Sequence, residues 1–127
     1  MSNYKEKNAD STYIDPKEFA VAEKEADNSG YSYTHKFIKP FSYDGKTYTE
    51  LSFYWDRLTG RDSLAIENEM QLLGKTVVVH ALSSDYLIRM AARACSEKIG
   101  IDAFDIMSIR DFNKIRSAAR SFLLKSE

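Results

Sequence analysis

The chain has 127 residues, a length that suits one domain and is too short for two ordinary ones. Its 18 basic and 19 acidic side chains give a formal net charge of -1, which argues against a general nucleic-acid binder. A single cysteine, Cys95, excludes an internal disulfide and a zinc cluster. No apolar run approaches the roughly 20 residues that cross a bilayer, and the polar N-terminus does not resemble a signal peptide. We therefore expect a cytoplasmic protein that does not associate with a membrane.

The N-terminal residues differ in charge from the remainder of the chain. Residues 1–30 hold 4 basic and 7 acidic side chains, whereas residues 31–127 hold 14 basic and 12 acidic ones. Asp15 and Pro16 favour a short helix over residues 17–27, because Asp caps a helix and Pro tolerates its first position. The alternative is an acidic arm that is only partly ordered. We predict a flexible, acidic N-terminal arm over residues 1–30 and one folded domain over residues 31–127.

An aromatic β-hairpin is predicted at the start of this domain. Nine of the 16 aromatic residues lie between Tyr31 and Trp55. Asp44 and Gly45 between two β-forming runs favour a tight turn in which both residues have positive φ. Pro40 cannot donate a ladder hydrogen bond, so its strand should have a free edge or a bulge there. The opposed pairs expected from this turn are Phe41 with Tyr48, Lys39 with Glu50, Ile38 with Leu51, Phe37 with Ser52, and Lys36 with Phe53.

The predicted hairpin is apolar on both faces. One face carries Ile38, Leu51, Phe53 and Trp55, and the other carries Phe37, Phe41, Tyr48 and Tyr54. An isolated two-stranded unit is marginally stable in water, so both faces need packing partners. We expect the first face to pack on the chain's own helices. The second face is expected to bind another copy or a different protein, with the N-terminal arm folding back over it as the alternative.

Three helices are expected after the hairpin, which gives an α+β fold with the hairpin packed against about three helices. Thr59 with Asp62 and Ser108 with Asp111 form capping-box-like starts for the first and last helix. Either Ser83 or Ser84 caps the helix between them. The expected buried stripes are Leu64, Ile66, Met70 and Leu73; then Leu87, Met90, Ala91, Ala94 and Cys95; then Ile109, Phe112, Ile115, Ala119, Phe122 and Leu123.

The connections between these helices carry weaker signals. Gly74 and Gly100 are the expected stops of the first two helices. Residues 76–79 read as a short extended piece that could add a third strand. Residues 101–107 are expected to form one tight helical turn.

No residue pattern predicts catalysis or metal binding. Cys95 lies on an apolar helical stripe, where a buried structural thiol is the ordinary interpretation. Asp102 and Asp105 lie in a polar turn and are interpreted as solvated capping residues rather than an acid–base pair. The histidines and the cysteine lack the spacing of a metal site. We expect a protein that is not an enzyme and has no cofactor or metal.

Basic residues on the second and third helices are the remaining candidates for partner contacts. Arg89 and Arg93 lie one turn apart, and Arg110 and Lys114 open a basic series on the last helix. Such a face is solvated, meets an acidic partner or contacts nucleic acid, and the charge balance makes nucleic acid the weaker interpretation. The residues predicted to bind protein are Phe37, Phe41, Tyr48, Tyr54, Arg89, Arg93, Arg110 and Lys114.

From Tyr33 to Leu124 the order of elements resembles the tail assembly chaperones of long-tailed bacteriophages and prophages. The family has a strand, a turn with Asp-Gly, a second strand, a helix with a central acidic residue, an Ala-rich helix and a final helix ending Phe-Leu. The matching words in this chain are Phe41 to Leu51 (FSYDGKTYTEL), Leu58 to Asp62 (LTGRD) leading to Glu67, Ala91 to Ala94 (AARA), Ile99 to Asp102 (IGID), Ile106, Asp111-Phe112 and Phe122-Leu123.

This resemblance implies a chaperone that holds the aggregation-prone tape measure protein and helps tail-tube subunits polymerise around it. The implied partners are the tape measure protein and the tail-tube protein, with self-association into a homo-oligomer. The implied location is the cytoplasm of a bacterial host cell. The alternative is a small regulatory protein of a mobile element that binds nucleic acid through its basic C-terminal helix.

Overall fold

The structure is a computed structural model that describes residues 32–126. It confirms the predicted α+β class, with an antiparallel hairpin and helices packed against it. The expected arm over residues 1–30, with its helix over 17–27, lies outside the described residues. The elements in chain order are β1 (Ser32–Tyr43), β2 (Lys46–Tyr54), the 3-10 turn η2 (Trp55–Arg57), α2 (Gly60–Leu72), the 3-10 turn η3 (His80–Leu82), α3 (Ser84–Ala94), α4 (Ile101–Asp105) and α5 (Ile109–Lys125).

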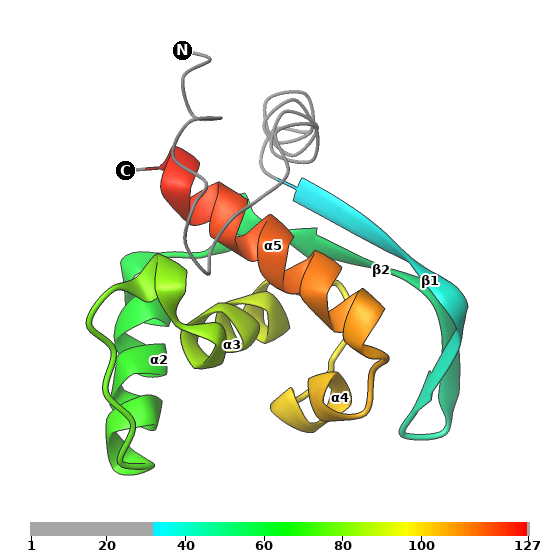
Figure 1. The fold of residues 1–127 in the computed structure, drawn as a ribbon, viewed down its shortest axis with the longest axis horizontal. Coiled ribbons are helices and arrows are strands. Elements are labelled where there is room, and N and C mark those ends of the chain that lie inside the picture. Colours follow the sequence, from blue (N-terminus) through cyan, green and yellow to red (C-terminus); the bar gives the residue numbers. More distant parts are fainter. Residues whose placement is uncertain (1–31, 127) are drawn as a thin grey trace, which may run out of the picture.

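The hairpin and α2 lie on opposite sides of the described domain, with α3 and α5 between them (Figure 1). α3 is the central helix and contacts α2, α4, α5 and β2. α5 packs against both α3 and β1. An aromatic contact joins α5 to η2, directly after the hairpin, because Trp55 stacks on Phe122 at 6.1 Å between ring centroids.

The turn of the hairpin is the one that its sequence predicts. Asp44 and Gly45 have φ values of 52° and 78°, the conformation that a tight two-residue hairpin turn requires. Phe41 pairs with Tyr48, as expected from this turn.

Beyond Phe41 the predicted pairing is wrong because of a large bulge in β1. Residues 37–40, including Pro40, lie between the paired positions Lys36 and Phe41, whereas one residue of β2 separates their partners. The bulge expected at Pro40 is confirmed, and its extra residues shift every earlier pair. Four predicted pairs are therefore wrong: Ile38 with Leu51, Lys39 with Glu50, Phe37 with Ser52, and Lys36 with Phe53. The same residues of β2 pair instead with earlier residues of β1: Leu51 with His35, Glu50 with Lys36, Ser52 with Thr34, and Phe53 with Tyr33.

The bulge also changes which residues reach the core. Leu51, Phe53 and Trp55 are buried as expected, but Ile38, assigned to the same face, is 53% exposed. Phe41 is buried, although the sequence analysis placed it on the outer face. A free aromatic face on this hairpin was therefore a wrong prediction.

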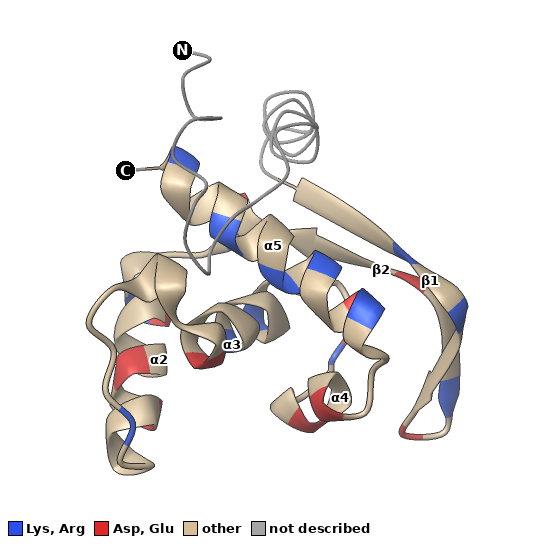
Figure 2. Cartoon of the chain, viewed as in Figure 1, with Lys and Arg blue, Asp and Glu red and all other residues tan. Residues whose placement is uncertain are grey.

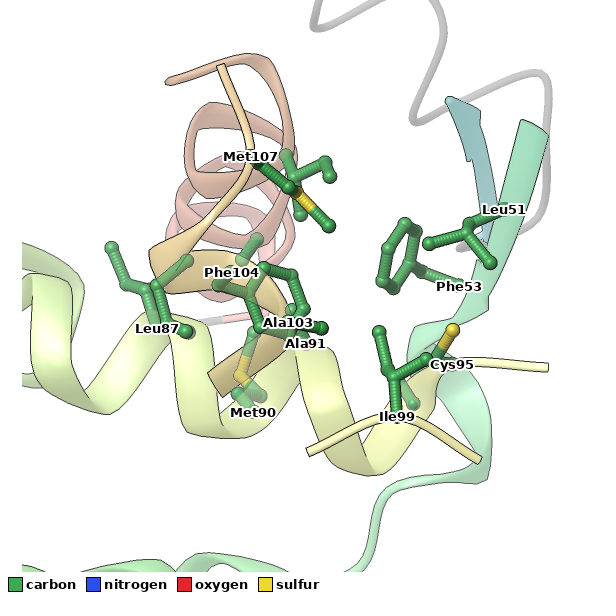
Figure 3. Packing of buried hydrophobic residues seen from close by; sticks show 14 of the residues in the cluster. Leu51, Phe53, Leu87, Met90, Ala91, Cys95, Ile99, Ala103, Phe104 and Met107 are labelled. Carbon is green, nitrogen blue, oxygen red and sulfur yellow. The ribbon is translucent and has the colours of Figure 1, made fainter. Parts of the chain in front are cut away.

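The core forms where the hairpin meets α3, α4 and α5. Leu51 and Phe53 face Ala91, Ala103, Phe104 and Met107 across it (Figure 3). The predicted stripe of α3 is confirmed, because Leu87, Met90, Ala91, Ala94 and Cys95 are all buried. Three residues assigned to the core stripes of α2 and α5 are exposed instead: Leu64, Leu73 and Ile109.

The helix starts follow their capping residues, but two predicted connections are wrong. α2 follows Thr59, α3 follows Ser83 and α5 follows Ser108, as their hydroxyls indicate. α3 ends at Ala94, well before Gly100, which instead precedes the predicted short helix α4. Residues 76–79 form no strand in the described chain, and Val78 is 90% exposed.

Candidate functional site

The eight residues predicted to bind protein do not form one surface. On the hairpin, Phe41 is buried, and Phe37 and Tyr48 are partly buried against the core. Phe37 stacks on Phe41 at 5.0 Å between ring centroids, so the two rings support each other inside the fold. Tyr54 alone of these four is exposed, at 39%.

Arg89 and Arg93 are paired within the fold rather than free to meet a partner. Arg89 is buried, and its Nε donates to Glu69 Oε2 at 2.9 Å while its Nη1 donates to the Asp85 carbonyl at 3.1 Å. Arg93 Nε donates to Asp62 Oδ1 at 2.8 Å. These cations hold α2 against α3, so the structure gives no support to the prediction that they contact a partner.

Arg110 and Lys114 are exposed one turn apart near the start of α5. Figure 2 shows this basic side of α5 far from the acidic residues of α2. The next two cations of α5 are engaged inside the fold: Arg116 donates to Ser84 Oγ at 3.1 Å, and Arg120 donates to the Ala81 carbonyl at 2.8 Å. Arg110 and Lys114 therefore form a small basic surface of their own.

The strongest candidate site is the side of α2 that faces away from α3, which we call the α2 outer surface. It consists of Arg61, Leu64, Ala65, Asn68 and Leu72, spaced so that they share one face of the helix. Leu64 is 68% exposed and Leu72 is 81% exposed, although a leucine at either position could contribute about 1.5–3 kcal/mol if buried. A hollow of about 470 Å³ is lined, among the described residues, by Arg61, Leu64, Ala65 and Asn68.

α2 thus carries apolar side chains on two opposite faces. Ile66 and Met70 are buried against α3, while Leu64 and Leu72 point away from it. An ordinary surface helix has one apolar face and one charged face. A helix with two apolar faces fits between two packing partners, and α3 is one of them.

Polar contacts fix the orientation of α2 on α3. Besides the two arginine pairs, Ser63 Oγ lies 2.6 Å from the Tyr86 hydroxyl. Glu67 Oε2 lies 2.7 Å from His80 Nε2 on η3. Because such pairs demand specific geometry, they determine which face of α2 is inward and leave the leucines of the α2 outer surface in solvent.

More apolar side chains are exposed just beyond α2. Leu73 and Val78 in the connection to η3 are exposed, as are Val79 and Leu82 beside η3. This connection runs back alongside α2 to η3 (Figure 1). The α2 side of the molecule is therefore rich in exposed apolar groups, as is typical of protein-binding surfaces.

Cys95 and Asp102, which the sequence offered as candidates for chemistry, take structural positions in the fold. Nowhere in residues 32–126 do three His, Cys, Asp or Glu side chains gather as a metal ion would require. Burial raises the pKa of the Cys95 thiol, which disfavours the reactive thiolate. Asp102 accepts a hydrogen bond from the Tyr43 hydroxyl at 2.8 Å and so ties α4 to the tip of the hairpin.

The spacing of the leucines in the sequence indicates the α2 outer surface, but assigning Leu64 and Ile66 to one apolar stripe hid it. Two residues, or about 200° of helical rotation, separate Leu64 from Ile66, so these side chains cannot share one face. Treating them as one approximate stripe placed Leu64 in the core. Leu72 received no assignment, although it follows Leu64 by eight residues.

Within the described part of the chain, no helix is both long and apolar enough to span a membrane. No protein-family model matches the chain, and neither a curated protein nor a solved structure is significantly similar to it.

Proposed function

We propose that this protein is a tail assembly chaperone of a bacteriophage or prophage, acting without catalysis in the bacterial cytoplasm. It would hold the tape measure protein in a soluble state while tail-tube subunits assemble around it. The resemblance of residues 33–124 to tail assembly chaperones supports this function. The main structural observation in its favour is the exposed apolar α2 outer surface. A chaperone of this kind needs apolar groups that are exposed in the free protein and buried in the complex.

An apolar helical segment of the tape measure protein is the occupant that fits this surface. Leu64 and Leu72 are two turns apart, with the small Ala65 between them, so a second helix can approach closely. Arg61 at the first turn offers a charge to an acidic residue at one end of that segment. Recognition of an amphipathic helix by such a groove is a recurrent mode of peptide binding.

The expected affinity is moderate, as reversible handling of a client requires. Burial of apolar surface contributes roughly 25 cal/mol per Å², and lost translational and rotational freedom offsets several kcal/mol of the gain. A site dominated by two leucines therefore favours a complex that forms readily and releases its client when tail-tube subunits compete.

Co-expression with the tape measure protein of the same phage or prophage tests the proposal. The wild-type chain should keep the tape measure protein soluble and co-purify with it in moderate salt. Leu64→Lys with Leu72→Lys should abolish co-purification, because a lysine at either position cannot be buried without a partner. Ile38→Lys, at an exposed apolar position on the hairpin, is the matched control and should bind normally.

Two outcomes would contradict the proposal. One is a tape measure protein that is equally soluble when expressed alone. The other is a complex that survives the double substitution on α2. Phe41 and Tyr48, first considered as contact residues, are unsuitable for this test because both pack within the fold.

The exposed pair of Arg110 and Lys114 is the feature that favours the alternative, a nucleic-acid-binding regulator. That function predicts duplex DNA binding that weakens steeply with salt and is lost when both residues are changed to Glu. The chaperone proposal predicts negligible DNA binding at physiological salt and a normal complex with the tape measure protein in this variant. Fluorescence anisotropy with a labelled duplex separates the two functions.

A further inference from the structure

A chain of hydrogen bonds with a buried central pair joins β1 to α5. His35 is 1% exposed, and its Nε2 lies 2.7 Å from Asp111 Oδ1, across 76 residues of sequence. The Tyr33 hydroxyl lies 2.9 Å from His35 Nδ1. On the other side, the Ser108 hydroxyl donates to Asp111 Oδ2 at 2.7 Å. We call these four residues the buried relay after its central pair, His35 and Asp111; Tyr33 at one end is half-buried and Ser108 at the other is exposed.

The geometry of the buried relay fits a neutral imidazole. A carboxylate only accepts hydrogen bonds, so Nε2 of His35 carries the proton that Asp111 binds. Nδ1 is then an acceptor, and the Tyr33 hydroxyl donates to it. Both ring nitrogens are satisfied in this tautomer. A second proton would require the Tyr33 hydroxyl to rotate and accept, and would enclose a cation at a side chain that is 1% exposed.

The surroundings of His35 disfavour that second proton. Burial lowers the pKa of His35 and outweighs the hydrogen bond and charge of Asp111, while the positive charge of Lys114 acts in the same direction as burial. Burial would raise the pKa of Asp111, but hydrogen bonds from Ser108 and His35 outweigh it and hold that pKa below its usual range. Both shifts match a neutral ring beside an ionised carboxylate at neutral pH.

We propose that the buried relay is an acid-sensitive latch that holds the hairpin on α5, and that proton uptake by His35 releases it. The groups facing His35 are Tyr33 and Phe37 from β1, and Asp111 and Lys114 from α5, while β2 places Leu51 opposite it. This device is independent of the α2 outer surface, which lies on the other side of α3.

The sign of the pH effect follows from linkage. A histidine with a lower pKa in the folded state binds more protons when unfolded, so stability falls as the pH drops below about 6.5. Asp111 acts in the same direction below about pH 4, where the unfolded chain takes up a proton that the folded carboxylate still resists. Release of the latch would expose apolar side chains beneath the hairpin, including Phe53 of β2 and Trp55 of η2.

Nuclear magnetic resonance of the full chain tests the latch directly. His35 should take up its proton only below about pH 6.5, together with faster amide exchange in β1 and the first turns of α5 and increased binding of an apolar dye. His80→Gln identifies the His35 resonance, because these are the only two histidines of the chain. A His35 ring that is protonated at pH 7, or protonation without faster exchange in β1 and α5, would overturn the proposal.

Two substitutions separate the latch from general acid denaturation. His35→Gln keeps a donor toward Asp111 but does not titrate, so unfolding between about pH 7 and 5 should lose its pH dependence. Tyr33→Phe removes the donor to Nδ1 and should let His35 take up its proton at a higher pH than in the wild type. Each unit of difference between the folded and unfolded pKa corresponds to a tenfold change in the ratio of folded to unfolded protein, reached in full once the pH lies below both values.

The outcome remains decisive if one variant folds poorly. Unchanged pH dependence in His35→Gln would refute the latch. If His35→Gln does not fold, an unchanged His35 titration in Tyr33→Phe would refute it instead. Neither result bears on binding of the tape measure protein at neutral pH, so failure of the latch is distinguishable from failure of the chaperone proposal.

Discussion

Phe53 connects more of the core than its position near the end of a strand would suggest. Its side chain is fully buried and stacks between Tyr33, at 6.3 Å, and Trp55, at 5.6 Å between ring centroids. Its backbone also pairs with Cys95 at the end of α3. One residue thus links the hairpin and η2 through its ring and the end of α3 through its backbone, and loss of the ring would leave a cavity in the core.

Phe53→Ala is expected to lower the free energy of unfolding by about 3–5 kcal/mol, because burial is lost and the surrounding groups cannot close the space. Leu64→Ala should change it by no more than about 0.5 kcal/mol, because that leucine is already in solvent. Urea denaturation at neutral pH measures both values. Similar losses in the two variants would show that Leu64 is buried in solution.

At the scale of the elements, polar contacts at its first turn hold α2 in place. Asp62 accepts hydrogen bonds from the Thr59 backbone N–H at 2.8 Å and from Arg93 at 2.8 Å. The bond from Thr59, followed by that from Arg93, holds the pKa of Asp62 below its usual range. The carboxylate therefore stabilises α2 above its unfolded pKa near 4, and that contribution is lost as the pH falls through the folded value.

Asp62→Ala is expected to accelerate amide exchange across α2 by about fivefold to tenfold, which corresponds to roughly 1 kcal/mol for a lost cap. Exchange in α3 and α5 should change less, because their starts keep their own caps at Ser83 and Ser108. Asp105→Ala, an exposed carboxylate on α4, is the control. Uniform acceleration in all helices would instead indicate global destabilisation.

At the scale of the whole molecule, the hairpin and the α2 outer surface are separated by α3 and α5 (Figure 1). Most aromatic residues of the hairpin pack into or against the core. The structure therefore does not support the expectation that the chain self-associates through an aromatic face of the hairpin. Exposed leucines and valines gather instead on the α2 side. We therefore expect any homo-oligomer to form through α2 and to compete with client binding.

Sedimentation of the purified chain checks this expectation. Leu64→Lys with Leu72→Lys should raise the monomer fraction, because a charged side chain at a buried contact is costly. Tyr54→Ser, at the exposed hairpin position, should leave the distribution unchanged. A larger effect of Tyr54→Ser would return the interface to the hairpin, and a wild-type protein that is monomeric at high concentration would exclude self-association.

The sequence by itself determined the features that depend on neighbouring residues. Asp44 and Gly45 fixed the hairpin turn, because few residues adopt positive φ easily. Thr59, Ser83 and Ser108 set the helix starts, because a hydroxyl there can accept orphan N–H groups of the first turn. The spacing of apolar residues in α3 identified its buried stripe, because α3 has neighbours on most of its surface.

Only the tertiary structure decided the features that depend on residues far apart in the chain. The bulge around Pro40 shifted the register of β1, so Phe41 entered the core and Ile38 faced solvent. The contact of His35 with Asp111 spans 76 residues, and no local pattern indicates it. α2 has two apolar stripes of similar strength, and contacts with α3 selected Ile66 and Met70 for burial. Turns and helix starts depend on neighbouring residues, so the sequence predicts them. Which apolar face is buried depends on how the elements pack against one another, so only the tertiary structure shows it.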